Sequence, residues 1–374
     1  MIVDVNLPQK IETKLGGEYN VESVINDDGT QTLNINYVGS AGENKVTQIM
    51  NNTVVSLSTE DLKGVTNIKD YIFRNCTSLE NVELPNTIES IGSYAFYGCT
   101  GLTEFKIPDS VTTIGSYVFN SCSNLDTLYM GNGVTSIGSN SFVSCPLSKM
   151  YIHDLEHWFN NAILDMIGVI RLDEIYLNNE LIEDVIVPDT VTTIPRECFI
   201  YVKSIKSVTI SDSVTRVMDS AFSECENLET VTFGDNIELL NTHVFARSTK
   251  LNKLINSDKV GYVNSSCFQD CTGLTGEISF LNATQIKNYA FAGCKNISSF
   301  VLGEVCTTIS ASAFRNCSNL RTLTIKATTP PSLANTNAIS TATTTIYIPK
   351  GTLEAYSTAT NWSSFASKFV EKEM

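Results

Sequence analysis

Cysteine is the residue type in this sequence with the most chemical potential, because thiols form disulfides, bind metals and act as nucleophiles. The chain has 11 cysteines, and eight of them lie three residues after a phenylalanine of a repeating series: Cys76, Cys99, Cys122, Cys145, Cys225, Cys271, Cys294 and Cys317. In a stack of repeats they form a column whose Cβ atoms lie about 4.8 Å apart, whereas a disulfide prefers about 3.8 Å. We therefore expect buried free thiols.

Two spacings could hold a metal ion. Cys267 and Cys271 form a C-x₃-C pair, but both also occupy regular repeat positions. His153 and His157 are four residues apart beside Asp154, a spacing that can present two ligands on one helix face. The order His-Asp-Leu-Glu-His differs from the H-E-x-x-H motif of zinc enzymes, so we expect a solvated helix face and no metal.

Catalytic motifs are absent from the sequence. It contains no G-x-S-x-G nucleophile elbow, no phosphate-binding G-x-x-x-x-G-K-[ST] and no dinucleotide-binding G-x-G-x-x-G. No feature marks a pair of acids for glycoside hydrolysis. We therefore expect a protein that is not an enzyme, with no catalytic residue and no cofactor.

The strongest signal is a period of 23 residues. Phenylalanine recurs at this step in two series, which are Phe73, Phe96, Phe119 and Phe142, then Phe199, Phe222, Phe245, Phe268, Phe291 and Phe314. An aliphatic residue stands five positions before each of them, and Leu or Ile stands six positions after all but Phe142. Such a fixed period is the signature of a repeat protein.

One repeat reads as a strand, a corner, a tight turn and a second short strand. Residues 125–130 alternate as a half-buried strand does, and residues 115–122 place Val118, Phe119 and Cys122 on one side of a short helical or 3₁₀ turn. A single repeat cannot bury this apolar set. Stacking the repeats buries it and forms a parallel ladder of strands, so the sequence predicts a repeat solenoid.

The phrase from Ile91 to Leu102, I-G-S-Y-A-F-Y-G-C-T-G-L, resembles the BspA-like class of bacterial leucine-rich repeats. Strand ends such as Leu84-Pro85 and Ile107-Pro108 agree with this class, and the resemblance covers about residues 60–360. It implies a right-handed, curved leucine-rich-repeat superhelix of the horseshoe type, rich in parallel strands. It also implies the family's usual setting, the bacterial cell surface, and a role in adhesion or in binding host and matrix proteins.

Departures from the period divide the chain. We expect a β-hairpin cap at 1–50, repeats at 51–145, an enlarged repeat at 146–190, repeats at 191–326 and a C-terminal cap at 327–374. The enlarged repeat should contain a short helix capped by Asp154 and a hairpin turning at Asn178-Asn179. The C-terminal cap should contain a strand at 345–349 and helical turns at 352–370.

Charge and hydropathy constrain location and partners. The net charge of −15 repels nucleic acid and anionic lipid, and no apolar run reaches the length of a membrane span. No signal peptide is visible at the start of the sequence. We expect an extracellular or cell-surface protein and a monomer, with a cytoplasmic or virion-associated location as the alternative.

The outward side chains of the strand ladder form the candidate ligand-binding surface, with a protein or a glycan as partner. Counting eight and ten positions from each phenylalanine places Lys106, Tyr129, Met150 and Ile152 outward, beside Trp158 of the enlarged repeat. Exposed aromatic and apolar groups together mark interfaces. Two readings stay open, since the insertion could also fold back and bury this cluster. The alternative function is a structural component of a prophage, a phage tail or another particle.

Overall fold

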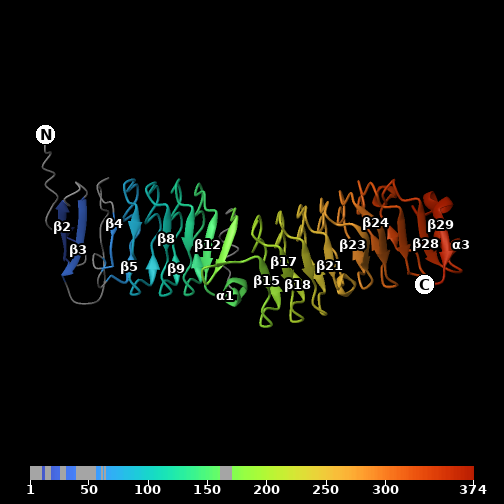
Figure 1. Cartoon of the computed structure of the whole chain (residues 1–374), viewed down its shortest axis with the longest axis horizontal. Helices are drawn as coiled ribbons and strands as arrows, with labels where there is room; N and C mark the ends of the chain where they lie inside the picture. The colour runs from blue at the N-terminus through green and yellow to red at the C-terminus, as the bar shows by residue number, and fades with distance from the viewer. Residues whose placement is uncertain are drawn as a thin grey trace. The chain divides into compact units, whose positions relative to one another are not determined.

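The computed structural model describes residues 11–12, 18–25, 31–38, 56–59, 62, 65–160 and 171–374. It divides into two compact units, Met1–Glu180 and Leu181–Met374. Each unit is a parallel β-solenoid in which every repeat makes one coil (Figure 1). The predicted leucine-rich-repeat solenoid is confirmed. A coil is named below by its phenylalanine.

The first unit opens with an antiparallel sheet and continues with coils (Figure 1). The antiparallel sheet consists of β1 (Ile11–Glu12), β2 (Glu18–Ile25) and β3 (Gln31–Val38). The main parallel ladder contains β8 (Glu104–Lys106), β10 (Thr127–Tyr129), β12 (Lys149–Ile152) and β13 (Glu174–Leu177), with β14 (Glu180–Leu181) beside β13. A second ladder contains β5 (Asn67–Ile68), β7 (Ser90–Ile91), β9 (Thr113–Ile114) and β11 (Ser136–Ile137), and β4 (Ser56–Leu57) pairs with β6 (Asn81–Val82).

The second unit repeats this plan. One side carries β15 (Asp184–Ile186), β17 (Ser207–Thr209), β19 (Thr230–Thr232) and β21 (Lys253–Ile255), then β22 (Gly276–Phe280), β24 (Ile297–Leu302), β26 (Thr322–Ile325), β28 (Thr345–Pro349) and β29 (Phe369–Lys372). The other side carries β16 (Thr193–Ile194), β18 (Arg216–Val217) and β20 (Leu239–Leu240), then β23 (Gln285–Ile286), β25 (Thr308–Ile309) and β27 (Ser332–Leu333). Three 3₁₀ segments are η1 (Ser257–Lys259), η2 (Thr336–Ala338) and η3 (Ser363–Lys368), and the one helix that the structure describes in this unit is α3 (Leu353–Thr358).

Stacked phenylalanines form the spine of each unit. Phe96 and Phe119 stack at 5.7 Å between ring centroids with an interplanar angle of 4°. In the second unit Phe222 lies 5.6 Å from Phe199 and 5.7 Å from Phe245. Their side chains are buried, and aromatic pairs of this kind add about 0.5–1.5 kcal/mol each beyond their buried area.

The turn around each phenylalanine differs from the helical or 3₁₀ turn that the sequence predicts. The residues two before and two after the phenylalanine both have positive φ, as in Tyr117 (59°) and Ser121 (63°) around Phe119. This conformation costs free energy in residues other than glycine. Hydrogen bonds between coils offset that cost, because the N–H groups of Tyr117, Phe119 and Ser121 donate to carbonyls of the next coil at 3.0, 2.8 and 2.9 Å. The backbones of neighbouring coils are therefore held in register on this side as well.

The enlarged repeat packs inward. It contains α1 (Leu155–Asn160), and the Asp154 carboxylate accepts a hydrogen bond from the Glu156 N–H at 2.8 Å, as expected of the cap. Trp158 and Phe159 are 4% and 2% exposed. Asn178 and Asn179 have φ of 52° and 69°, the conformation of a tight hairpin turn.

The C-terminal end closes the stack of the second unit. The Tyr356 hydroxyl donates to the Ala327 carbonyl at 2.7 Å, and the Trp362 indole N–H donates to the Pro331 carbonyl at 2.6 Å. Both side chains are buried. β29 pairs in parallel with β28, whereas we had expected helical turns to continue to residue 370.

Candidate binding site

The register of the ladder corrects the predicted outward row. Thr127 and Tyr129 pair with Lys149 and Tyr151, so Lys149 and Tyr151 point outward in the Phe142 coil. Met150 and Ile152, which we placed on the surface, are 0% and 4% exposed. The reason is one missing residue: the buried leucine follows Cys145 by two positions, at Leu147, where other coils have three. Because side chains alternate along a strand, a shift of one residue exchanges the two faces.

With this correction, three tyrosines form a continuous row on the outward face of the first unit. The rings of Tyr129 and Tyr151 stack at 4.3 Å, and those of Tyr151 and Tyr176 at 4.4 Å. At the β8 end, the Lys106 ammonium lies 4.8 Å from the centre of the Tyr129 ring. Across the neighbouring strands β13, β12, β10 and β8, the outward positions therefore hold Tyr176, Tyr151, Tyr129 and Lys106 in that order. We name these four residues the tyrosine row.

Each ring face inside the row is covered. Tyr151 lies between two other rings, and Tyr129 lies between Tyr151 and the Lys106 ammonium. All three tyrosines are half-buried. The row consequently presents ring edges and phenol groups to a partner, while a cation at one end adds positive charge.

Carboxylates on the adjoining positions act on the phenols. The Tyr176 hydroxyl donates to the Glu174 carboxylate at 2.8 Å, and this bond is the main cause that raises the pKa of Tyr176 to about 12. Burial, followed by the charge of Glu104, raises the pKa of Tyr129. Near neutral pH these phenols are therefore neutral donors and acceptors of hydrogen bonds.

The predicted site residues divide into two groups. Lys106 is exposed and Tyr129 is half-buried on the outward face, while Met150, Ile152 and Trp158 are buried. Met150 and Ile152 are buried because the register turns them inward, and Trp158 is buried in α1, so these three residues do not belong to an outward cluster. Tyr151 and Tyr176 were missed, although the serine at position 148 in place of the repeat's leucine signalled the shift.

The cysteines have a structural role that the spacing alone did not show. The Sγ atom of a coil's cysteine donates to the phenylalanine carbonyl of the preceding coil, as Cys99 does to Phe73 at 3.0 Å. The same bond is made by Cys122, Cys145, Cys225, Cys271, Cys294 and Cys317. Ser248 makes it with its hydroxyl at 3.0 Å. In the Phe199 coil, Val202 stands at the position of the cysteine. That coil is the first phenylalanine coil of the second unit, so no earlier coil of this type offers a carbonyl there.

The buried thiols are poorly suited to chemistry. None of the 11 cysteines is joined in a disulfide, and all but Cys145 are buried. Burial raises the pKa of Cys76 to about 11 and that of Cys225 far above its ordinary value. At the buried positions the nucleophilic thiolate is therefore scarce at neutral pH. The half-buried Cys145 is the exception, because its hydrogen bond with the Cys122 thiol lowers its pKa.

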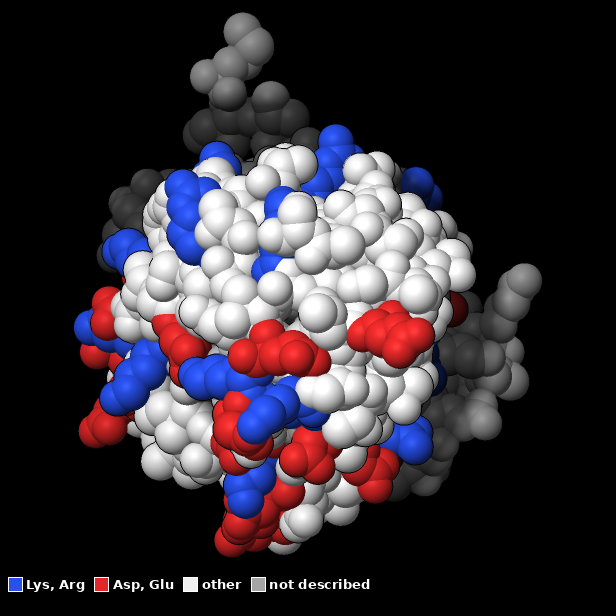
Figure 2. Space-filling view, turned by 90° about the vertical axis from the view of Figure 1, so that its right-hand side faces the viewer, with Lys and Arg blue, Asp and Glu red and all other residues white. Residues whose placement is uncertain are grey.

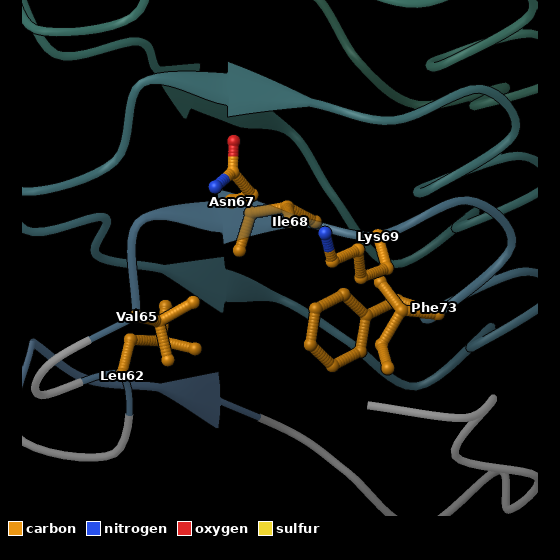
Figure 3. Close-up of a pocket in the computed structure, with 7 residues that line it drawn as sticks. Leu62, Val65, Asn67, Ile68, Lys69 and Phe73 are labelled. Carbon is orange, nitrogen blue, oxygen red and sulfur yellow. The ribbon is translucent and has the colours of Figure 1, made fainter. Parts of the chain in front are cut away.

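The remaining chemical candidates do not converge. His153 precedes α1, so it does not share a helix face with His157. In the part of the chain that the structure describes, no group of three or more His, Cys, Asp or Glu residues could hold a metal ion. A pocket near the start of the coils is lined by Leu62, Val65, Asn67, Ile68, Lys69, Ile72 and Phe73 (Figure 3). Among the described residues that line it, Lys69 is the one ionisable group.

The stacked parallel coils with their buried aliphatic and phenylalanine positions define a leucine-rich-repeat solenoid. The sequence matches the BspA type leucine rich repeat region over residues 49–165, 172–283 and 276–359, in six copies. This chain belongs to the family of BspA-type leucine-rich-repeat proteins. No curated protein matches it.

Three solved structures are similar to this chain. The pneumococcal vaccine antigen PcpA is 14% identical with a TM-score of 0.50, and the match covers 97% of each chain. A leucine rich cell surface protein from Faecalibacterium prausnitzii is 22% identical with a TM-score of 0.42, covering 95% of this chain and 99% of that one. A leucine-rich repeat protein from Bacteroides ovatus is 17% identical with a TM-score of 0.41, covering 94% and 98%. At these identities the likeness to PcpA shows the fold alone.

Among the residues that the structure describes, no helix is long and apolar enough to cross a bilayer.

Proposed function

We propose that this chain is a non-catalytic binding module that recognises a protein through the tyrosine row of its first unit. The observation that carries the proposal is the row itself, three stacked tyrosines with a lysine at one end on an outward sheet face. Tyrosine supplies rigid contact area together with a polar group, which is why it is enriched at protein interfaces.

The ring geometry favours a protein over a glycan. A sugar that stacks on an aromatic side chain needs an open ring face, and the faces of Tyr151 and Tyr129 are already covered by their neighbours and by Lys106. Hydroxyl groups and ring edges instead suit the polar and carbonyl groups of a protein surface.

The corresponding face of the second unit has a different composition. Its outward positions are mostly hydroxyl residues, as in Ser207, Thr209, Thr230 and Thr232, with Tyr347 near its end. Small hydroxyl side chains offer little area for a stable contact, so we assign the energetic centre of binding to the first unit.

The charge of the chain does not favour an anionic partner. On the C-terminal end of the second unit, which faces the viewer in Figure 2, the Lys and Arg side chains form no continuous basic surface. With a net charge of −15, nucleic acid is an unfavourable ligand. We propose that the chain acts as a monomer outside the cell or at the bacterial surface, the setting usual for BspA-like repeats, where such binding serves adhesion.

A binding screen tests this function. The full chain is screened against extracellular-matrix proteins and against glycans at low and at physiological salt, so that nonspecific charge effects are recognised by their loss at higher salt. For a protein that binds, Tyr151→Ala should weaken binding about tenfold or more, the loss of about 1.4 kcal/mol typical of a central contact.

Tyr347→Ala is the matched control. Tyr347 also stands on an outward strand position, with the Lys372 ammonium 5.3 Å from its ring centre, but it belongs to the second unit and has no tyrosine row. Its loss should leave binding unchanged. Equal binding by the parent and by Tyr151→Ala would refute the site, and selective capture of glycans would refute the choice of a protein. Incorporation into a particle without any ligand would favour the structural alternative.

A further inference from the structure

A second aromatic cluster lies on the turn side of the first unit and surrounds an arginine. Tyr71, Tyr94 and Tyr117 stack in a column, with 4.8 Å between ring centres at each step and interplanar angles of 7°. Tyr97 leans on Tyr94 at 5.7 Å. The guanidinium carbon of Arg74 lies 5.7 Å from the ring centre of Tyr71, 5.8 Å from that of Tyr94 and 5.2 Å from that of Tyr97.

Three rings therefore orient one guanidinium. Contacts of this kind are attractive because the ring face is negative, and three of them restrict a side chain that otherwise samples many rotamers. Arg74 is exposed. Within the part of the chain that the structure describes, no acceptor hydrogen-bonds to its guanidinium and no carboxylate pairs with that group.

The charges around the cluster define what would bind. The charged and polar groups that act on the Tyr94 phenol are Tyr117, Tyr71, Arg74 and Tyr97. The carboxylate that adjoins the cluster, Asp70, accepts a hydrogen bond from the Ser93 N–H at 2.7 Å. One guanidinium with a planar fork of donors matches the two oxygens of a carboxylate. A phosphate or a sulfated chain carries more negative charge, which the net charge of −15 opposes.

We propose that Arg74, held by Tyr71, Tyr94 and Tyr97, is a receptor for a single carboxylate from an acidic side chain of a partner protein. The tyrosine rings contact the apolar stem of that side chain, and the guanidinium binds its two oxygens. This site is separate from the tyrosine row, and its test does not depend on the ligand of that row.

Arg315 provides a matched control on the same chain. Arg74 follows Phe73 directly and Arg315 follows Phe314 directly, so both occupy the same position of the repeat. Both are exposed, but Ser312 stands in the coil of Arg315 where Tyr71 stands in that of Arg74. The two arginines differ mainly in their aromatic surroundings.

The experiment is an NMR titration of the full chain, with the side-chain N–H signals of Arg74 and Arg315 assigned by Arg74→Lys and Arg315→Lys. Benzoate is the probe, benzamide its uncharged counterpart, and phenyl phosphate tests a higher charge. We expect benzoate to bind at Arg74 at least about three times more tightly than at Arg315, and benzamide to cause no saturable shift. Tyr97→Leu should reduce the difference without changing the fold, as judged by the backbone signals.

Equal affinities at the two arginines would overturn the proposal, because ordinary ion pairing would then explain the shifts. Tighter binding of phenyl phosphate than of benzoate would overturn the choice of carboxylate. N-acetylglutamate amide and glucuronate distinguish the two sources of this group, and a preference for glucuronate would overturn the assignment to a protein.

Discussion

Replacing Ser248 tests the hydrogen bonds that link the coils. Its side chain is buried, and its hydroxyl donates to the Phe222 carbonyl at 3.0 Å. Ser248→Ala changes the volume little but removes the donor. A net hydrogen bond contributes about 1 kcal/mol, and a buried acceptor left unpaired costs about 1–3 kcal/mol. We expect a loss of about 1–2 kcal/mol in the free energy of unfolding.

Ser248→Cys should restore most of that loss, because seven coils place a cysteine Sγ as donor at this position, as Cys271 does to Phe245 at 3.0 Å. We expect it to lie within about 0.5 kcal/mol of the parent. Urea unfolding followed by circular dichroism measures these differences. Ser318→Ala is the control, since that hydroxyl is exposed and its bond to the Lys295 carbonyl is 3.4 Å long. The reasoning is refuted if Ser248→Ala is as stable as the parent, or if Ser248→Cys is as unstable as Ser248→Ala.

Three further predictions follow from the core and from the ionisable groups. Phe222→Ala removes a buried ring stacked on both sides and should cost about 3–5 kcal/mol in urea unfolding; a loss under about 1 kcal/mol would contradict the stacked spine. In the native chain at pH 8, a thiol reagent should label Cys145 first and the buried cysteines only on unfolding; rapid labelling of several thiols would contradict their burial. Glu174→Gln should lower the pKa of Tyr176 from about 12 toward its ordinary value in an ultraviolet titration, because the charged acceptor is lost, and an unchanged titration would argue against that hydrogen bond.

The period of phenylalanines was enough to predict the solenoid. The residues around each phenylalanine form the same set of apolar positions. A single coil cannot bury this set, whereas stacked coils can. In the Phe268 coil the outward positions hold Glu277 and Ser279, and the ladder has a register shift at Gly276/Glu277.

The outward row of the Phe142 coil was predicted wrongly for a local reason. Counting from Phe142 ignored the short step from Cys145 to Leu147, so Tyr151 was taken as inward and the tyrosine row remained unseen. The deviation at Ser148 carried the information, but a single residue missing from the repeat is weaker evidence than the repeat itself.

Other features had no signal that sequence reasoning could use. The positive φ positions hold Tyr, Ser, Glu, His and Asn across the coils, so the glycine that usually marks this conformation is mostly absent. The cluster around Arg74 joins Tyr71 to residues of the next coil, a contact that depends on the exact stacking of side chains. The residues of β29 lie outside the 23-residue pattern, so the period does not predict that this strand pairs with β28.

Accessibility labelling tests the central claim, that tyrosines and not Met150 form the outward row, most directly. In a Cys145→Ser background, which retains a donor at that position, Tyr151→Cys and Met150→Cys are compared for their rate of reaction with a maleimide. The structure predicts rapid labelling of the cysteine at 151 and protection of the cysteine at 150 until the chain unfolds. Rapid labelling at 150 with protection at 151 would contradict the tyrosine row and the binding site built on it.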